Sequence, residues 1–183
     1  MELSPDHAAT SQIESRESIQ QLVLRHLLAT LAYRAAKVLR DVPSGFADTT
    51  FSPVTRRPVA IVAHLADLMA WAITLARGDN LWRAGGADDW DTEIKRFVDE
   101  LGTLDHVLLT TTLPSGAIEQ LIQGPLSDAL THVGQLALLR GMAHAPIRPE
   151  SFAKAQIVVG TVGLDQAPPR RPFDGDASER KKT

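Results

Sequence analysis

The residues best suited to chemistry are two histidines and an aspartate on two apolar segments. His64 lies in PVAIVAHLADLMAWAITLARG (58–78), and Asp128 and His132 lie in GPLSDALTHVGQLALLRG (124–141). Asp128 and His132 are four residues apart, so on a helix they share one face. If the two segments pack together, all three side chains can reach one point. Two imidazoles and a carboxylate suit a divalent transition ion, and three protein ligands leave positions open for water or substrate.

The same three residues also fit a structural role. A histidine on an apolar helical face is more often a satisfied core residue than a ligand, and Asp and His four residues apart commonly form a simple pair. A buried imidazole still needs a donor and an acceptor, or an anion when it is charged. We therefore expect Asp128 and His132 to meet His64 in either case. No separate general base stands out, so the sequence assigns no catalytic residue.

Other side chains carry weaker signals. Gln135 lies one turn from His132 and could hydrogen-bond a ligand, although helix packing is the commoner role. Arg140 and Glu150 could hold an anionic substrate, although surface ion pairs are the commoner role. The tryptophans could anchor the core or line the mouth of a pocket, and the first role is the commoner one; they are Trp71, Trp82 and Trp90. The other histidines could be structural residues or metal ligands, and His26 is the best candidate ligand among them; they are His7, His26, His106 and His144.

Helical periodicity dominates the chain and predicts an all-α fold. Apolar residues recur at intervals of three to four over about 15–40, 58–78, 89–113 and 124–144. Pro58 suits the first position of one helix, and Gly124 with Pro125 restarts the chain into the last. A short helix over 117–123 is expected, and no strand pair is apparent. Four long amphipathic helices predict an antiparallel or partly crossover four-helix bundle.

We divide the chain into three parts on this basis. Residues 1–14 are short, polar and terminal, and we expect them to be flexible. Residues 15–147 hold the predicted bundle. Residues 148–183 are rich in Gly, Pro and charge, and we expect an irregular C-terminal extension with a disordered end.

Composition narrows the function classes. The chain has 183 residues, of which 44% are hydrophobic, which fits one globular domain. It has no cysteine, so disulfides, thiolate ligands and a cysteine nucleophile are excluded. A net charge of −3 without a basic stripe argues against nucleic acid. The N-terminus lacks the features of a signal peptide, and His64 and Asp67 would be costly in lipid, so we expect a cytoplasmic protein with no membrane span.

Three stretches resemble the DinB-like (DinB/YfiT) superfamily: HLADLMAWAITLARG, WDTEIKRFVDELGTLD and GPLSDALTHVGQLALLRG. The resemblance covers roughly residues 15–147. It implies a four-helix bundle that holds one divalent ion, nickel or zinc in many relatives, on three histidines. Family members of known activity include metal-dependent thiol transferases and a thiol-dependent isomerase.

Two of the three histidine ligands that the family resemblance implies have a matching histidine in this chain, and the third position differs. His64 matches the histidine of the family's second helix, and His132 matches the histidine before Gly-Gln in the fourth. Where the family has a further histidine, this chain has Asp128. Asp128 could complete a 2-His-1-carboxylate set, or it could orient His132 as a hydrogen-bond acceptor outside the ligand set.

Two functional hypotheses follow. The first is a metal-dependent enzyme, a transferase or hydrolase acting on a small molecule, with nickel or zinc (iron or manganese as alternatives) and an external low-molecular-weight thiol as further reactant. The second is a non-catalytic binding or stress-associated protein in which His64, Asp128 and His132 form a structural polar network. A homodimer is expected and is compatible with both.

Overall fold

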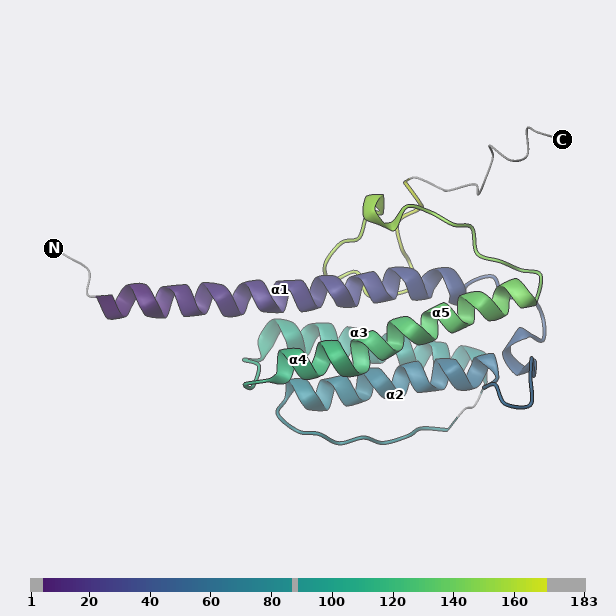
Figure 1. Ribbon diagram of the computed structural model, residues 1–183, viewed down its shortest axis with the longest axis horizontal. Helices are drawn as coiled ribbons and strands as arrows, with labels where there is room; N and C mark the ends of the chain where they lie inside the picture. The colour runs from purple at the N-terminus through teal and green to yellow at the C-terminus, as the bar shows by residue number, and fades with distance from the viewer. Residues whose placement is uncertain (1–4, 87–88, 171–183) are drawn as a thin grey trace.

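The fold is all-α, as the sequence predicts (Figure 1). The computed structural model describes residues 5–86 and 89–170, with side chains from residue 19 onward. Over these residues its elements are α1 Pro5–Leu39, η1 Phe46–Asp48, α2 Pro58–Ala76, α3 Trp90–Thr110, α4 Ala117–Leu121, η2 Ile122–Leu126, α5 Ser127–Met142 and η3 Phe152–Lys154. η1 and η3 are 3-10 helices, and η2 is a π-helical segment.

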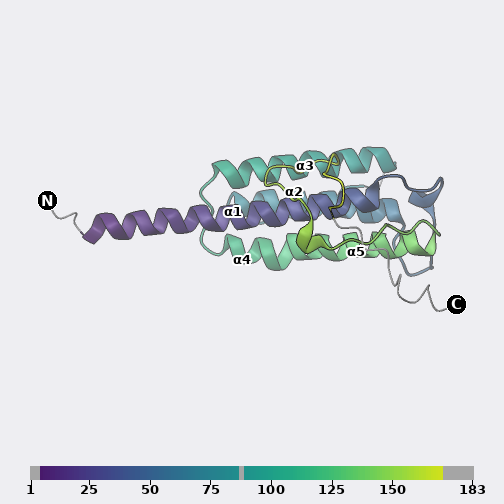
Figure 2. The ribbon, with the colours of Figure 1, turned by 90° about the horizontal axis from the view of Figure 1, so that it is seen from above.

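The four long helices surround one core. Figure 1 shows α1 above α2, and Figure 2 shows α3 and α5 on either side of that pair. Each helix contributes side chains that are almost wholly buried, among them Leu28, Leu65, Phe97, Leu104 and Leu136. The apolar spacing of the sequence therefore marks the faces that the helices bury.

α2 and α3 run in the same direction although they are consecutive in the chain. Trp90, at the start of α3, packs on Phe46, which precedes α2, with ring centroids 5.8 Å apart. At the other end, Gly78 after α2 lies against Pro114 after α3. The chain that follows α2 therefore returns along α2 before α3 begins (Figure 1). The connection from α2 to α3 thus crosses the length of the helices.

α2 is the most apolar helix and carries His64. It begins at Pro58, whose missing N–H costs nothing at the first helical position. By length and composition it could cross a membrane, but 72% of its most apolar window is buried inside the protein, as in a core helix.

Two helix boundaries differ from those expected. α1 begins at Pro5 rather than near residue 15, because nothing between Pro5 and residue 39 breaks a helix. The short helix ends at Leu121, and η2 leads from it directly into α5. Gly124 is the residue of η2 with non-helical dihedral angles, φ −94° and ψ −109°. The Gly-Pro pair therefore bends the helical path between α4 and α5.

The segment after α5 folds back onto α1. Glu150 is buried, where it accepts a hydrogen bond from the hydroxyl of Tyr33 and pairs with Lys37. Burial, and then Glu150, raises the pKa of Tyr33 to about 12. Arg140 is also buried and donates to the carbonyls of Val38 and Asp41 at the end of α1. The interpretation of Arg140 and Glu150 as surface ion pairs is thus wrong, since both are buried links to α1. The expected disordered end, residues 171–183, lies outside the described residues.

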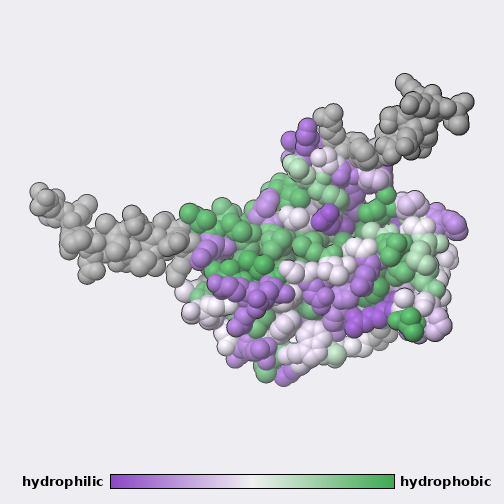
Figure 3. Space-filling model, viewed as in Figure 1, coloured by the Kyte–Doolittle hydropathy of each residue, from purple (hydrophilic) through white to green (hydrophobic). Residues whose placement is uncertain are grey.

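Some apolar side chains of α1 remain exposed. Ile19, Leu22 and Val23 are each more than half exposed and share one helical face. Figure 3 shows hydrophobic surface gathered over this part of α1. The expected homodimer stays a prediction, and this face is available for it.

A buried ion cluster fixes the loop between α2 and α3. Arg96 of α3 donates to Asp67 of α2 at 2.7 Å, to the carbonyl of Ala63 at 2.9 Å and to Glu93 at 2.8 Å. Asp67 also accepts from the backbone N–H of Gly85 at 3.0 Å. Because Asp67 is only 5% exposed, these bonds compensate a charge that would otherwise be costly to bury.

We predict that Gly85→Ala destabilises the fold. A Cβ atom at residue 85 would lie 2.9 Å from both Arg96 Nη2 and Asp67 Oδ1, and hydrogen bonds hold both groups in place. The free energy of unfolding in urea should fall by about 1–3 kcal/mol, as is usual for overpacking. Gly86→Ala is the matched control, because its Cβ would meet nothing within 4 Å. Equal stability of the two variants would show that the cluster does not hold the loop.

Candidate metal centre

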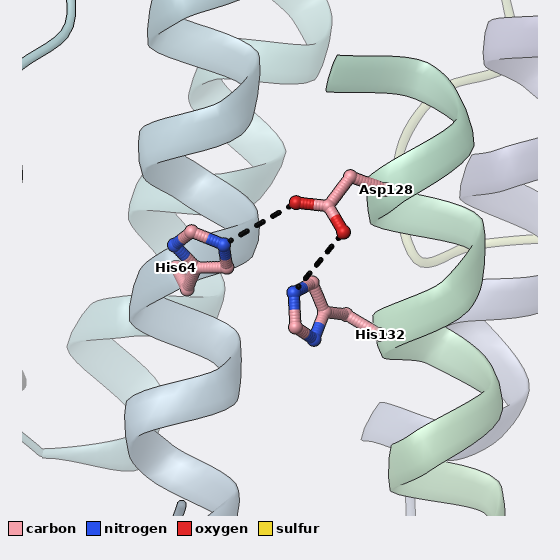
Figure 4. A group of neighbouring side chains, drawn as sticks. All are labelled: His64, Asp128 and His132. Atoms are coloured by element: carbon pink, nitrogen blue, oxygen red, sulfur yellow. Dashed lines mark ion pairs between the residues drawn. The ribbon is translucent and has the colours of Figure 1, made fainter. Parts of the chain in front are cut away.

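His64, Asp128 and His132 converge between α2 and α5 (Figure 4). His64 Nε2 lies 3.5 Å from Asp128 Oδ2, and His132 Nε2 lies 3.5 Å from Asp128 Oδ1. The two imidazole rings are perpendicular, with centroids 4.7 Å apart. One ligand atom from each residue lies within 4.8 Å of the other two. The convergence expected from the sequence is therefore present.

The spacing of these atoms resembles that of metal ligands. Both nitrogen–oxygen distances of 3.5 Å exceed the 2.7–3.2 Å of an ordinary N–H···O hydrogen bond. Two ligands that each lie about 2.0–2.1 Å from one tetrahedral ion are separated by roughly 3.3 Å. Small side-chain movements would thus let the three residues bind one ion.

Gln135 sets the orientation of the His132 ring. Its amide oxygen lies 2.8 Å from His132 Nδ1, and this oxygen accepts a hydrogen bond in the tautomer that carries the proton on Nδ1. In a neutral ring, Nε2 then has no proton and points its lone pair toward Asp128. A lone pair facing a carboxylate oxygen is unfavourable unless a cation lies between them. A metal ion between the two groups would satisfy both of them.

The surroundings of His64 favour its neutral form. Burial lowers the pKa of His64 below its usual 6.5, with smaller contributions from the charges of Arg56 and His132, and these outweigh the opposing effect of Asp128. The ring of Trp82 packs edge-on against His64, with centroids 5.6 Å apart. A neutral imidazole is the form that binds a metal ion.

Burial differs across the three residues. The side chains of His64 and His132 are 19% and 11% exposed, whereas that of Asp128 is 48% exposed. The imidazoles therefore approach from the protein interior and the carboxylate closes the site toward solvent. Such a site has room for a water molecule or a substrate on its open side.

The other histidines lie elsewhere. His26, His106 and His144 are exposed, and none of them belongs to this group. The side chain of His7 lies outside the described residues. Among the side chains that the structure describes, the three predicted residues make the one group suited to a metal ion.

Two neighbours have clearer roles in the structure than the sequence indicates. Helix packing is the commoner role for a glutamine at this position, and in the structure the amide of Gln135 contacts His132. Trp82 comes from the loop after α2, and its approach to His64 depends on that loop returning along the helix. The i,i+3 spacing of Gln135 and His132 in the sequence indicates that these two side chains can meet. No local sequence pattern indicates that Trp82 lies against His64.

Comparison of the chain with family models, with curated proteins and with solved structures returns no match. The DinB-like resemblance therefore rests on the quoted motifs alone. The candidate site rests on its own geometry.

We predict that His64 makes the metal-free protein less stable in mild acid. The unfolded chain takes up a proton near pH 6.5, while folded His64 takes it up only at lower pH. The unfolded state thus binds more protons in that interval, and the free energy of unfolding falls as the pH drops below 6.5, by at most about 1.4 kcal/mol per pH unit.

Urea unfolding with a chelator at pH 7, 6 and 5 measures this effect. His64→Gln should flatten the decline, because its side chain does not titrate. His106→Gln, at an exposed histidine outside the group, is the control. An equally steep decline in His64→Gln would contradict the prediction.

Proposed function

We propose that the chain is a metal-dependent enzyme with a DinB-like four-helix bundle. One divalent ion is held by His64, Asp128 and His132, and nickel or zinc is the ion that the family resemblance implies. The observation that carries the proposal is the position of Asp128, whose two oxygens each lie 3.5 Å from an imidazole Nε2. Gln135 supports it, because it leaves the lone pair of His132 directed toward Asp128.

The donor set fits such an ion. Two neutral imidazoles and one carboxylate leave a divalent ion with a net charge of +1 and with open coordination positions. A bound ion of this kind acts as a Lewis acid toward water or a thiol, which becomes a nucleophile at neutral pH. The protein's own residues supply the rest: Gln135 fixes the His132 tautomer, and the packing of α2 against α5 sets the distance between the imidazoles.

The proposed reaction is transfer or hydrolysis of a small molecule. The chain has no cysteine, so a thiol nucleophile would come from an external low-molecular-weight thiol. A thiol nucleophile is proposed because the family resemblance implies one. Hydrolysis by an activated water would use the same site. Activity of the zinc- or nickel-loaded protein with and without added thiol separates the two reactions.

A purely structural network is the competing function. A network of that kind gains most when its members are fully buried and satisfied. Asp128 is 48% exposed, and the pKa of His64 is lowered rather than raised beside it. Neither property is what a buried His–Asp ion pair needs, so the metal site is the better explanation.

The metal content of the purified protein tests the proposal. We predict about one ion per chain by elemental mass spectrometry after purification without chelator and incubation with zinc or nickel. His64→Ala and His132→Ala should each lose it, because two remaining ligands bind weakly. His106→Ala, at an exposed histidine, should keep it. Wild-type protein without a bound ion would leave the structural network as the function of this group.

Asp128 is tested separately as a ligand. Asp128→Ala removes both oxygens, and we expect metal affinity to fall at least tenfold. Asp128→Asn keeps the shape and one carbonyl oxygen but removes the charge, so its affinity should lie between that of the alanine variant and wild type. Calorimetric titration with zinc gives both affinities. Wild-type affinity in Asp128→Ala would show that the carboxylate is not a ligand.

Gln135 is predicted to strengthen metal binding through His132. Gln135→Leu has a similar size but removes the acceptor for Nδ1–H, so the ring loses its fixed tautomer. We expect a loss of about 10-fold to 100-fold in zinc affinity, as is typical for partners of this kind. Gln135→Glu retains an acceptor and should retain binding. Unchanged affinity in Gln135→Leu would remove Gln135 from the site.

A further inference from the structure

A hollow of about 400 Å³ opens beside Asp128. It is lined by Trp71, Gln123, Gly124, Ser127, Asp128 and Thr131. Asp128 thus belongs both to the candidate metal centre and to the wall of this hollow. A molecule in the hollow would therefore extend from the ion that the three ligands hold.

Trp71 forms the far wall because Gly124 has no side chain. A Cβ atom at residue 124 would lie 3.2 Å from Trp71 Cη2 and 3.3 Å from Cζ3. Its absence leaves space beside the six-membered part of the indole, and Trp71 lines the hollow. The indole is also held in place: its Nε1–H donates to Asn80 at 2.8 Å, and Trp82 packs edge-on against it. Trp71 is thus a rigid aromatic surface at one end of the hollow.

The aromatic wall and a candidate metal ligand line the same hollow. Trp71, Gly124 and Asp128 all belong to its lining, so a flat group against Trp71 could be joined to a reacting atom at the metal centre by a short spacer. Trp71 itself lies two helical turns from His64 on the same face of α2.

The lining carries no positive charge. Of its six residues, only Asp128 is charged, and its oxygens face the two imidazoles. The hydroxyls of Ser127 and Thr131 already donate to the carbonyls of Ile122 and Ser127. The lining has no cationic side chain to balance a phosphate or carboxylate, so binding an anion there would be costly.

We propose that the hollow binds an uncharged, flat apolar group of the substrate, which stacks on Trp71 while the reacting atom meets the ion on His64, Asp128 and His132. This inference rests on the proposed function, since it places the substrate relative to the metal centre. It adds the substrate class: a small molecule with an aromatic or similarly flat neutral group, rather than an anionic one.

Three thiols with the same two-carbon spacer test the substrate class. They are 2-phenylethanethiol, 2-mercaptoethanol and 2-mercaptoethanesulfonate, which end in a phenyl, a hydroxyl and a sulfonate group. Each can bind the open position of cobalt-loaded protein through sulfur, and the sulfur-to-cobalt absorption band reports the dissociation constant. We expect the phenyl compound to bind at least about tenfold more tightly than the hydroxyl compound, because it buries a ring. The sulfonate should bind no more tightly than the hydroxyl compound.

Substitutions of the residues that line the hollow test whether the tighter binding of the phenyl compound arises there. Trp71→Leu should reduce the preference for phenyl to less than threefold, and Gly124→Ala should reduce it by placing a methyl group between the ring and the hollow. Two matched controls should keep it. Trp90→Leu removes a tryptophan that packs on Phe46 instead, and Gly134→Ala adds a methyl group where nothing lies within 4 Å.

The outcomes separate the two proposals. Equal binding of the three thiols to wild-type protein, or a phenyl preference that survives in both Trp71→Leu and Gly124→Ala, would overturn the substrate class while leaving the metal centre intact. Cobalt that fails to bind, measured directly as metal content before any thiol is added, would instead overturn the proposed function and this inference with it.

Discussion

Asp128 lies between two imidazole nitrogens, each 3.5 Å from one of its oxygens, and that arrangement suits a cation. In the His132 tautomer that donates from Nδ1 to the amide oxygen of Gln135, Nε2 faces the carboxylate with a lone pair. Burial keeps the pKa of His64 low, so the second proton that would make this ring cationic is disfavoured at neutral pH. A divalent ion would satisfy all three groups at once, with the carboxylate charge partly balancing that of the ion.

The scaffold explains how the three side chains stay close without being sequestered from solvent. α2 supplies His64 from a helix that is mostly buried, and α5 supplies Asp128 and His132 from one face. The loop after α2 returns along that helix and is fixed by Arg96 and Asp67, which places Trp82 against His64. Asp128 remains half exposed and also lines the hollow beside Trp71. Rigid helices thus position the ligands, while the kink at Gly124 shapes the space beside them.

Much of this arrangement could be predicted from local sequence patterns. The spacing of apolar residues indicates the long helices, and Pro58 marks where α2 begins, because these signals act within a few residues. The four-residue spacing of Asp128 and His132 likewise places them on one helical face. The meeting of His64 with that pair required only that an apolar helix bury its imidazole with partners.

What could not be predicted depends on contacts between distant parts of the chain. The burial of Arg140 and Glu150 follows from the segment after α5 folding back onto α1, which no local spacing encodes. The same holds for Trp82, whose position depends on the parallel run of α2 and α3. The identity of the ion is a question of chemistry that a fold does not decide.

The central claim is that one ion binds to His64, Asp128 and His132 together. An anomalous difference map from crystals grown with one equivalent of zinc, with data collected on both sides of the zinc absorption edge, tests it most directly. We predict a single strong peak about 2.0–2.2 Å from His64 Nε2, His132 Nε2 and an Asp128 oxygen. A peak elsewhere, or none between these residues while Asp128 stays hydrogen-bonded to a protonated imidazole, would contradict the account.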